Sequence, residues 1–312
     1  MARLTPLSLA DARGLARGYD LEFVSVEPLD AGSVNSNFRL RSADGATWFG
    51  RLYEEQGEAG ARFEATLARA LSLRGVPVAV PLQARDGGVP SHAGRPFSLA
   101  PWIEGESLCQ ARVTPAHARA VGEALARVHA TAEVAPPRGR FELSDLERRL
   151  ERVEREGSSE LVRAAGEARG VLARAAAGRS AGLPEGLVHG DLFRDNVLWR
   201  EGELVALLDF ESASAGVLAY DLAVTLLAWC FGDELDRALV GAMVGGYESV
   251  RPLSACEREG LAAEARMACA RFTVTRLTDY SLRAPPGQPP RRDFRRFLAR
   301  LAAIDAGALD LR

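Results

Sequence analysis

The pattern of apolar and polar positions changes character near residue 105. Before it, short stretches of alternating or apolar residues are separated by turn residues, which is typical of β-strands. Two other segments, residues 8–17 and 61–74, repeat their apolar residues at helical spacing. We therefore predict a small antiparallel sheet with one main helix and a short leading helix. The expected strands cover residues 23–26, 37–41, 47–52, 80–83 and 97–102.

Beyond residue 105 the pattern becomes mostly helical. Thr114 and Pro115 form a typical helix start, and apolar residues recur at helical spacing as far as His129. A charged helical segment follows at residues 143–177, and several more helices are expected beyond Tyr220. The chain is thus predicted to be an α+β protein of two lobes, a sheet lobe at residues 1–103 and a larger, mostly helical lobe at residues 104–312.

Composition narrows the possible partners. The 312 residues are 47% hydrophobic and 26% charged, the formal net charge is -3, and all 39 basic residues are arginines interspersed with acidic ones. Neither a nucleic acid nor a membrane is an expected partner, while the oligomeric state is left open. The four cysteines lack Cys-x-x-Cys spacing and are expected to be free thiols in a cytoplasmic protein.

Residues 187–199 carry the strongest chemical pattern. They contain His-x-Asp, four further residues and then Asn, which is the catalytic-loop spacing of kinases. Phosphoryl transfer needs a carboxylate that orients the attacking hydroxyl and oxygen ligands for magnesium. Asp191 is the predicted catalytic carboxylate, and Asn196 is a predicted metal ligand. His189 is expected to be a structural residue of the loop.

A hairpin and an apolar strand then lead to Asp209, the second predicted metal ligand. Carboxylate and amide oxygens suit Mg²⁺, a hard cation that keeps several waters. A single carboxylate in a turn would be weak support for a kinase. The combination of the strand before the loop, the His-x-Asp-x4-Asn spacing, the apolar strand after it and Asp209 is specific. The sequence therefore indicates an ATP- and Mg²⁺-dependent kinase that acts on a small-molecule hydroxyl, with a protein-kinase-like two-lobed fold.

The loop between the first two predicted strands is a candidate for covering the ATP phosphates. Gly32 would let the backbone approach closely, and Ser33 and Asn35 could donate hydrogen bonds. The alternative is an ordinary hairpin turn, because turns of this composition are common.

Further nucleotide contacts are predicted in the same lobe. Arg51 stands where protein kinases carry a lysine, and Glu64 stands where its ion-pair partner belongs. An exposed surface pair is the alternative interpretation. Main-chain groups around Ala100 and Trp102 are expected to bind the adenine.

Two arginines near the end of the chain are candidates for binding an acceptor carboxylate, because a guanidinium fork matches that group. They are Arg271 and Arg276. For each of them a salt-bridged helix face is the alternative.

Residues 189–198 resemble the aminoglycoside phosphotransferase and choline kinase superfamily, and are most similar to the type II homoserine kinases of bacterial threonine biosynthesis. Phe193 and Asp195 carry the finer resemblance. Residues 32–38, 220–230 and 271–277 extend it over most of the chain. The resemblance implies ATP-dependent phosphorylation of homoserine, with Asp191 in the base-like role and Asn196 and Asp209 on the metal.

Two other functions stay open from the sequence. The acceptor could be an aminoglycoside, an amino alcohol or a sugar, and the acidic segment 230–236 would suit a cationic one. A kinase-like binding module without activity is the second alternative, supported by Arg51 at the lysine position. The presence of Asp191, Asn196 and Asp209 together argues against it.

Overall fold

The computed structural model describes residues 5–29, 35–285 and 288–309. The chain divides into two compact units, one of Met1–Glu106 with Leu198–Leu208 and the other of Ser107–Val197 with Asp209–Arg312. The first unit thus also includes a hairpin that the sequence-based division placed in the second lobe. The cause is hydrogen bonding, because Glu106 and Trp199 exchange main-chain bonds of 2.9 Å and the Leu207 amide donates to the Pro77 carbonyl.

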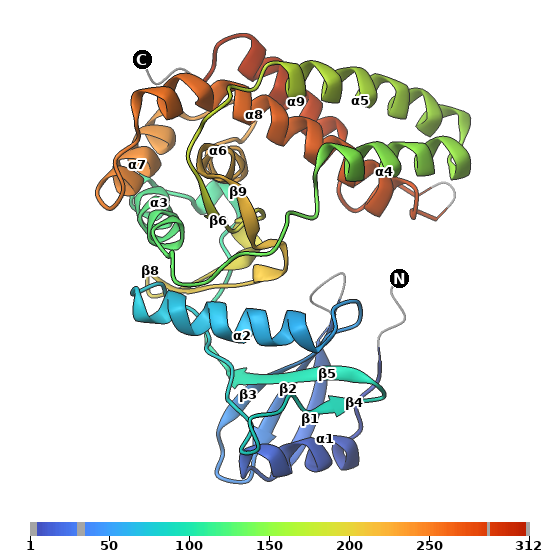
Figure 1. Cartoon of the computed structure of the whole chain (residues 1–312), viewed down its shortest axis with the longest axis vertical. Coiled ribbons are helices and arrows are strands. Elements are labelled where there is room, and N and C mark those ends of the chain that lie inside the picture. Colours follow the sequence, from blue (N-terminus) through green and yellow to red (C-terminus); the bar gives the residue numbers. More distant parts are fainter. Residues whose placement is uncertain (1–4, 30–34, 286–287, 310–312) are drawn as a thin grey trace. The chain divides into compact units, whose positions relative to one another are not determined.

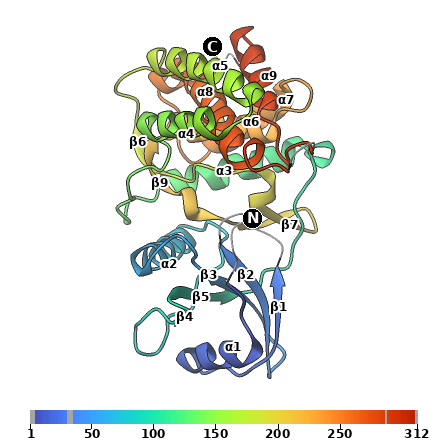
Figure 2. The ribbon, with the colours of Figure 1, turned by 90° about the vertical axis from the view of Figure 1, so that its right-hand side faces the viewer.

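The first unit is built on a five-stranded antiparallel sheet with the strand order β1-β2-β3-β5-β4 (Figures 1 and 2). Its strands are β1 (Phe23–Leu29), β2 (Ser36–Ser42), β3 (Thr47–Leu52), β4 (Ser91–His92) and β5 (Arg95–Pro101). The helices are α1 (Leu9–Ala16) and α2 (Glu58–Leu73), and the hairpin consists of β7 (Val197–Arg200) and β8 (Glu203–Leu207). Apolar side chains of α1 pack with inward-facing residues of the strands, such as Phe23, Leu40 and Phe97, in one buried cluster.

Local chemistry explains where these elements begin and end. α1 starts at a capping box in which the Ser8 hydroxyl accepts from the Asp11 amide and the Asp11 carboxylate accepts from the Ser8 amide. The strand predicted at residues 80–83 is wrong, since that segment is irregular. Pro77 and Pro81 cannot donate to a ladder, and the Leu82 amide makes a single bond to β5, at 2.7 Å from the Leu99 carbonyl, among the described residues.

The second unit is mostly helical. Its helices are α3 (Pro115–His129), α4 (Leu143–Glu156), α5 (Ser159–Ala177), α6 (Leu218–Trp229), α7 (Arg237–Glu248), α8 (Ala255–Arg276) and α9 (Arg295–Asp305). Thr114 caps α3 as predicted. One buried cluster joins α4, α5 and α8 through residues such as Leu150, Leu172 and Val274. α8 is the longest helix and continues into a π-helical turn, Leu277–Ser281.

A two-stranded antiparallel ribbon positions the chemistry in this unit. β6 (Glu185–Val188) pairs with β9 (Ser214–Val217), so the residues after β6 and those before β9 lie together. The predicted fold class, a sheet lobe followed by a helical lobe of the protein-kinase type, is confirmed. Within the described ranges, every helix is too short or too polar to cross a membrane.

Candidate functional site

Asp191 and Asn196 lie in the loop that follows β6. Asn196 ends a short 3-10 turn, Arg194–Asn196, and its Nδ2 donates a hydrogen bond of 2.8 Å to the main-chain oxygen of Asp191. The loop is therefore closed on itself across five residues. With Nδ2 used in this way, the side-chain oxygen of Asn196 is the atom left to face a cation.

Asp209 follows β8 and has a conformation that is unusual for a residue with a side chain. Its φ and ψ of 62° and 65° lie in the left-handed region, which costs free energy for residues other than glycine and recurs at functional sites. Its Oδ1 atom is buried and has no hydrogen-bond partner among the described residues. An unpartnered buried carboxylate oxygen is costly, and a bound cation would satisfy it.

These oxygens fit Mg²⁺ better than a transition metal. No group of three or more His, Cys, Asp and Glu residues that could hold a metal occurs in the described part of the chain. Mg²⁺ does not require such a cluster, because it binds one or two carboxylates and completes its shell with waters and substrate phosphates. Asp209 and Asn196 supply a donor set of that kind.

The carboxylate of Asp191 lies among opposing charges. Burial raises its pKa, and the neighbouring Asp209 carboxylate adds to the rise, while the guanidinium of Arg271 lowers it. Arg271 Nη1 is 3.3 Å from Asp191 Oδ1. Arg271 therefore stabilises the ionised form of a carboxylate that its surroundings would otherwise protonate more readily.

Two aromatic rings hold Arg271 in this position. Its Cζ atom is 4.0 Å from the centroid of the Phe141 ring and 3.8 Å from that of Phe272, and only 4% of its side chain is exposed. A guanidinium between two ring faces gains cation–π attraction and loses freedom to rotate. Of the two predicted arginines, this is the one that the structure brings to Asp191.

Arg276 has different contacts. Its Nη1 donates to the main-chain oxygen of Asp293 at 2.8 Å, and its guanidinium lies over the Phe297 ring. Burial, with the nearby charges of Arg292 and Arg300, lowers its pKa to about 10. The structure thus ties Arg276 to the segment before α9, and the acceptor role suggested for it stays a prediction.

Asp221 in α6 fixes the start of the catalytic loop. Its carboxylate accepts from the main-chain amides of His189, at 2.6 Å, and Gly190, at 2.8 Å. His129 Nε2 lies 3.0 Å from the same carboxylate. Burial alone would raise the pKa of Asp221, but the hydrogen bonds from His129 and the loop hold it below the ordinary value. Asp221 thus ties the start of the catalytic loop to α6. The contribution of His129 was not predicted, because its partner lies 92 residues away.

Gly190 is required where the loop passes close to the residues before β9. Its φ is +77°, and a Cβ atom placed on it would lie 3.0 Å from the Ser212 carbonyl oxygen. A larger residue would strain both the backbone and this contact. The glycine therefore lets the two strands of the ribbon present Asp191 and Asp209 to one region.

In the first unit, the predicted pair of Arg51 and Glu64 is formed. Arg51 Nη1 lies 3.0 Å from Glu64 Oε1, and Arg51 Nε donates to Asn37 Oδ1 at 3.2 Å. The Asn35 side-chain oxygen accepts from the Glu54 amide at 3.1 Å. Gly32 and Ser33, the other predicted phosphate-loop residues, lie outside the described residues.

The ladder of β5 decides which main-chain groups face away from the sheet. Ala100 pairs with Phe49, and the Trp102 amide donates to the Thr47 carbonyl at 3.1 Å. Because antiparallel ladders alternate, the carbonyl of Pro101 and the amide of Ile103 point away from β3. The adenine contact predicted at residues 100–102 stays a prediction, and these two groups are its better-placed candidates.

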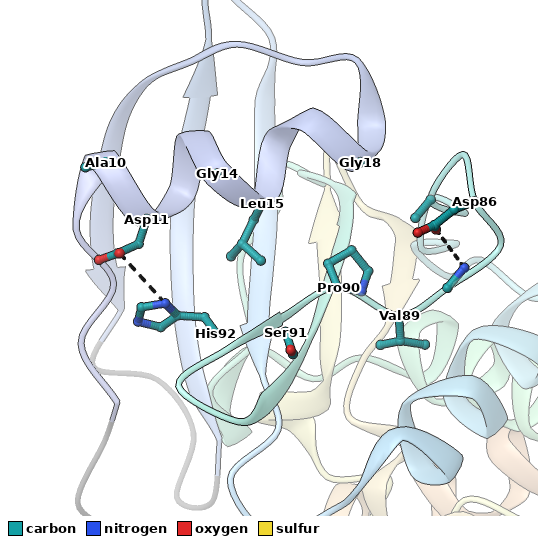
Figure 3. A pocket seen from close by; sticks show the side chains of 12 residues that line it. Ala10, Asp11, Gly14, Leu15, Gly18, Asp86, Val89, Pro90, Ser91 and His92 are labelled. Carbon is teal, nitrogen blue, oxygen red and sulfur yellow. Dashed lines mark hydrogen bonds and ion pairs between the residues drawn. The ribbon is translucent and has the colours of Figure 1, made fainter.

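A hollow of about 460 Å³ lies elsewhere in the first unit, between α1 and residues 84–92. Figure 3 shows Asp11 and His92 facing each other at its edge, with 3.9 Å between Oδ1 and Nδ1. Of the predicted site residues that the structure describes, none is among those that line it.

Besides His129, a second residue near the catalytic loop was not predicted from the sequence. Arg292, in the segment before α9, donates a hydrogen bond to Oδ2 of Asp195. Asp195 was singled out by its position in the loop motif, but nothing local connects it to an arginine 97 residues later.

Known proteins resemble this chain over most of its length. The model of the phosphotransferase enzyme family matches residues 25–253. A homoserine kinase of Neisseria meningitidis is 35% identical over 90% of this chain and 92% of its own. A homoserine kinase of Methylobacterium radiotolerans is 35% identical over 98% of both chains.

Solved structures share the fold at much lower identity. A spectinomycin phosphotransferase, solved with ADP and spectinomycin, is 12% identical with a TM-score of 0.71, covering 97% of this chain and 99% of its own. An ethanolamine kinase of Plasmodium vivax is 13% identical with a TM-score of 0.63, covering 99% and 92%. With the family match over residues 25–253 and the 35% identity to homoserine kinases, this chain belongs to the phosphotransferase enzyme family.

Proposed function

We propose that this protein is an ATP-dependent kinase that phosphorylates the hydroxyl of L-homoserine to give O-phospho-L-homoserine, a step of threonine biosynthesis. The 35% identity to homoserine kinases over 90% or more of the chain supports the acceptor. The observation that carries the chemistry is the Asp191 carboxylate, paired with Arg271 at 3.3 Å in the same unit as the unpartnered oxygen of Asp209.

Asp191 has two tasks in this reaction. Its ionised carboxylate accepts a hydrogen bond from the acceptor hydroxyl and orients the oxygen for in-line attack on the γ-phosphorus of ATP. The new phosphorus–oxygen bond forms as the bond from phosphorus to the oxygen of ADP breaks. The hydroxyl proton passes to Asp191 and then to solvent, so the products are the phosphate ester, ADP and one proton.

Asn196 and Asp209 are the residues that would hold Mg²⁺. When bound, the ion neutralises the phosphate charge that develops during transfer. Local structure orients both ligands. The hydrogen bond from Asn196 to the main chain of Asp191 fixes the Asn196 amide, and the left-handed backbone of Asp209 sets the direction of its carboxylate. Arg271 favours the ionised form of Asp191.

The nucleotide is assigned to groups of the first unit. Arg51, fixed by Glu64, is proposed to contact the ATP phosphates together with Gly32, Ser33 and Asn35. Main-chain groups at the end of β5 are proposed to bind the adenine. All four cysteines are free, which fits a reducing cytoplasm where ATP and amino acids are also found.

An ADP-release assay with Mg-ATP tests this function. The acceptor panel contains L-homoserine, choline, ethanolamine, several sugars and an aminoglycoside, and mass spectrometry confirms the phosphorylated product. We expect preference for L-homoserine and a loss of turnover of about 10³-fold in Asp191→Asn. Preference for another acceptor would refute homoserine alone, and ADP binding without any turnover would refute the kinase.

A further inference from the structure

A second charged pair joins the catalytic loop to the segment before α9 and has no part in the mechanism above. Asp195 belongs to the turn Arg194–Asn196, and its Oδ2 accepts a hydrogen bond from Nη2 of Arg292. Both side chains are accessible to solvent, whereas that of Arg271 is buried: 52% of the Asp195 side chain and 34% of the Arg292 side chain are exposed. A ligand can therefore reach an anion and a cation that lie side by side.

This pair is close to the carboxylate that orients the acceptor hydroxyl. Asp195 is four residues beyond Asp191 in a loop that the Asn196 side chain closes at 2.8 Å. Arg292 is also close enough to Asp191 for its charge to lower the pKa of that carboxyl. The Tyr280 ring lies beside Arg292, with its centroid 5.7 Å from the Arg292 Cζ atom.

The charges of the pair match those of the proposed acceptor. L-Homoserine carries an ammonium and a carboxylate on one carbon, and its hydroxyl lies two methylene groups away. A carboxylate binds an ammonium through charge-assisted hydrogen bonds, and a guanidinium binds a carboxylate through its planar fork. An uncharged sugar or a singly charged amino alcohol would use only part of this arrangement.

Bonding within the pair leaves room for such a ligand. The hydrogen bond between them uses one oxygen of Asp195 and one nitrogen of Arg292. Oδ1 of Asp195 and further N–H groups of Arg292 are left to bind. The side chain of Arg271 is 4% exposed and pairs with Asp191, and Arg276 donates to the main chain of Asp293. Both arginines are therefore less available to an acceptor than Arg292.

We propose that Asp195 binds the α-ammonium and Arg292 the α-carboxylate of the acceptor, so that this pair selects amino acids with a γ-hydroxyl. The inference rests on the proposed function and adds the residues that choose the substrate. Because these contacts are the same in the ground state and the transition state, losing one raises KM and leaves kcat nearly unchanged.

Three acceptors separate the two contacts. L-Homoserine has both charges, 4-hydroxybutyrate lacks the ammonium, and 2-amino-1,4-butanediol lacks the carboxylate. For each we would measure kcat/KM by ADP release, or the inhibition constant against L-homoserine where turnover is too slow. The variants are Asp195→Asn and Arg292→Gln. The matched controls are Glu160→Gln and Arg295→Gln, which break an exposed ion pair of the same unit, 73% and 56% exposed.

Each variant should weaken only the ligands that carry its partner charge. Asp195→Asn should lower kcat/KM for L-homoserine by about 10- to 100-fold, as expected for a hydrogen bond to a charged group, and change the constant for 4-hydroxybutyrate by less than about threefold. Arg292→Gln should show the reverse selectivity, sparing the amino diol. Both controls should keep wild-type constants.

Other results would overturn the inference. Equal losses on all three ligands, or a changed KM for Mg-ATP in Asp195→Asn, would show that the residue acts through the neighbouring metal ligand. Wild-type selectivity in both variants would show an ordinary surface ion pair. Absence of homoserine phosphorylation by the wild-type protein would refute the proposed function itself. That failure is distinguishable from failure of the Asp195 and Arg292 assignment, because it is seen in the wild-type protein alone.

Discussion

Replacing Asp221 by Asn should both destabilise the protein and slow the reaction. The carboxylate accepts from two main-chain amides, at 2.6 and 2.8 Å, and lies 3.0 Å from His129 Nε2. An asparagine has one oxygen, and its NH2 group would face donors. At about 1.5–3 kcal/mol for each hydrogen bond to a charged group, the loss of one or two contacts amounts to about 1.5–6 kcal/mol.

Such a loss is a large share of the total stability of about 5–15 kcal/mol that is usual for proteins. Urea unfolding followed by tryptophan fluorescence should show a much lower midpoint with an unchanged slope. Because the amides of His189 and Gly190 would lose their partner, we also expect kcat to fall by about 100-fold in the folded variant, as the loop displaces Asp191.

The dependence of stability on pH gives an independent check. Folding lowers the pKa of Asp221, so its contribution is fully present above the unfolded pKa and is lost as the pH falls through the folded pKa. Asp221→Asn has no carboxyl group at this position. Its free energy of unfolding should therefore fall less steeply than that of the wild type as the pH is lowered. Asp236→Asn is the control, since Asp236 also accepts from two amides, at 2.8 and 3.1 Å, but from a helix cap where Asn serves equally. A free energy of unfolding within about 1 kcal/mol of wild type, with full kcat, would refute the role assigned to Asp221.

Three further changes test the site. Arg271→Met removes a cation that lowers the pKa of Asp191, so the acid limb of kcat/KM should move to higher pH, while Arg271→Lys should move it less; identical limbs would contradict the pairing. Asp209→Asn should raise the Mg²⁺ concentration needed for half-maximal rate by at least about tenfold, and unchanged metal dependence would remove Asp209 from the metal. Arg51→Lys cannot bind both Glu64 and Asn37 as the guanidinium does, so kcat/KM for ATP should fall by about tenfold, with L-homoserine binding as the unaffected comparison.

How much could be predicted from the sequence depended on how far apart the interacting residues lie. The catalytic loop is specified within eight residues, His189 to Asn196, so its spacing alone indicated the chemistry. Arg51 and Glu64 are 13 residues apart and were placed together by the order of strand and helix. The strand predicted at residues 80–83 was wrong because their apolar character resembles a strand, while Pro81 within the segment and Pro77 before it cannot donate to a ladder.

The contacts that no local pattern could supply are those between distant helices and the loop. Arg292 bonds to Asp195 across 97 residues, and His129 reaches Asp221 across 92. Neither partner has a spacing that marks it, since each meets the site only through packing of the helical unit. The same holds for Phe141, which holds Arg271 over its ring at 4.0 Å.

This division between local and distant residues separates reaction type from acceptor choice. The loop motif and Asp209 provide what every phosphoryl transfer to a hydroxyl needs, a carboxylate and metal ligands. The charges that surround Asp191, in contrast, come from α8 and the segment before α9, which carry Arg271 and Arg292. A fold can keep its loop and accept another alcohol when these elements change. Acceptor specificity should therefore follow the sequence of residues 271–295, and the Asp195 and Arg292 variants probe where that region meets the loop.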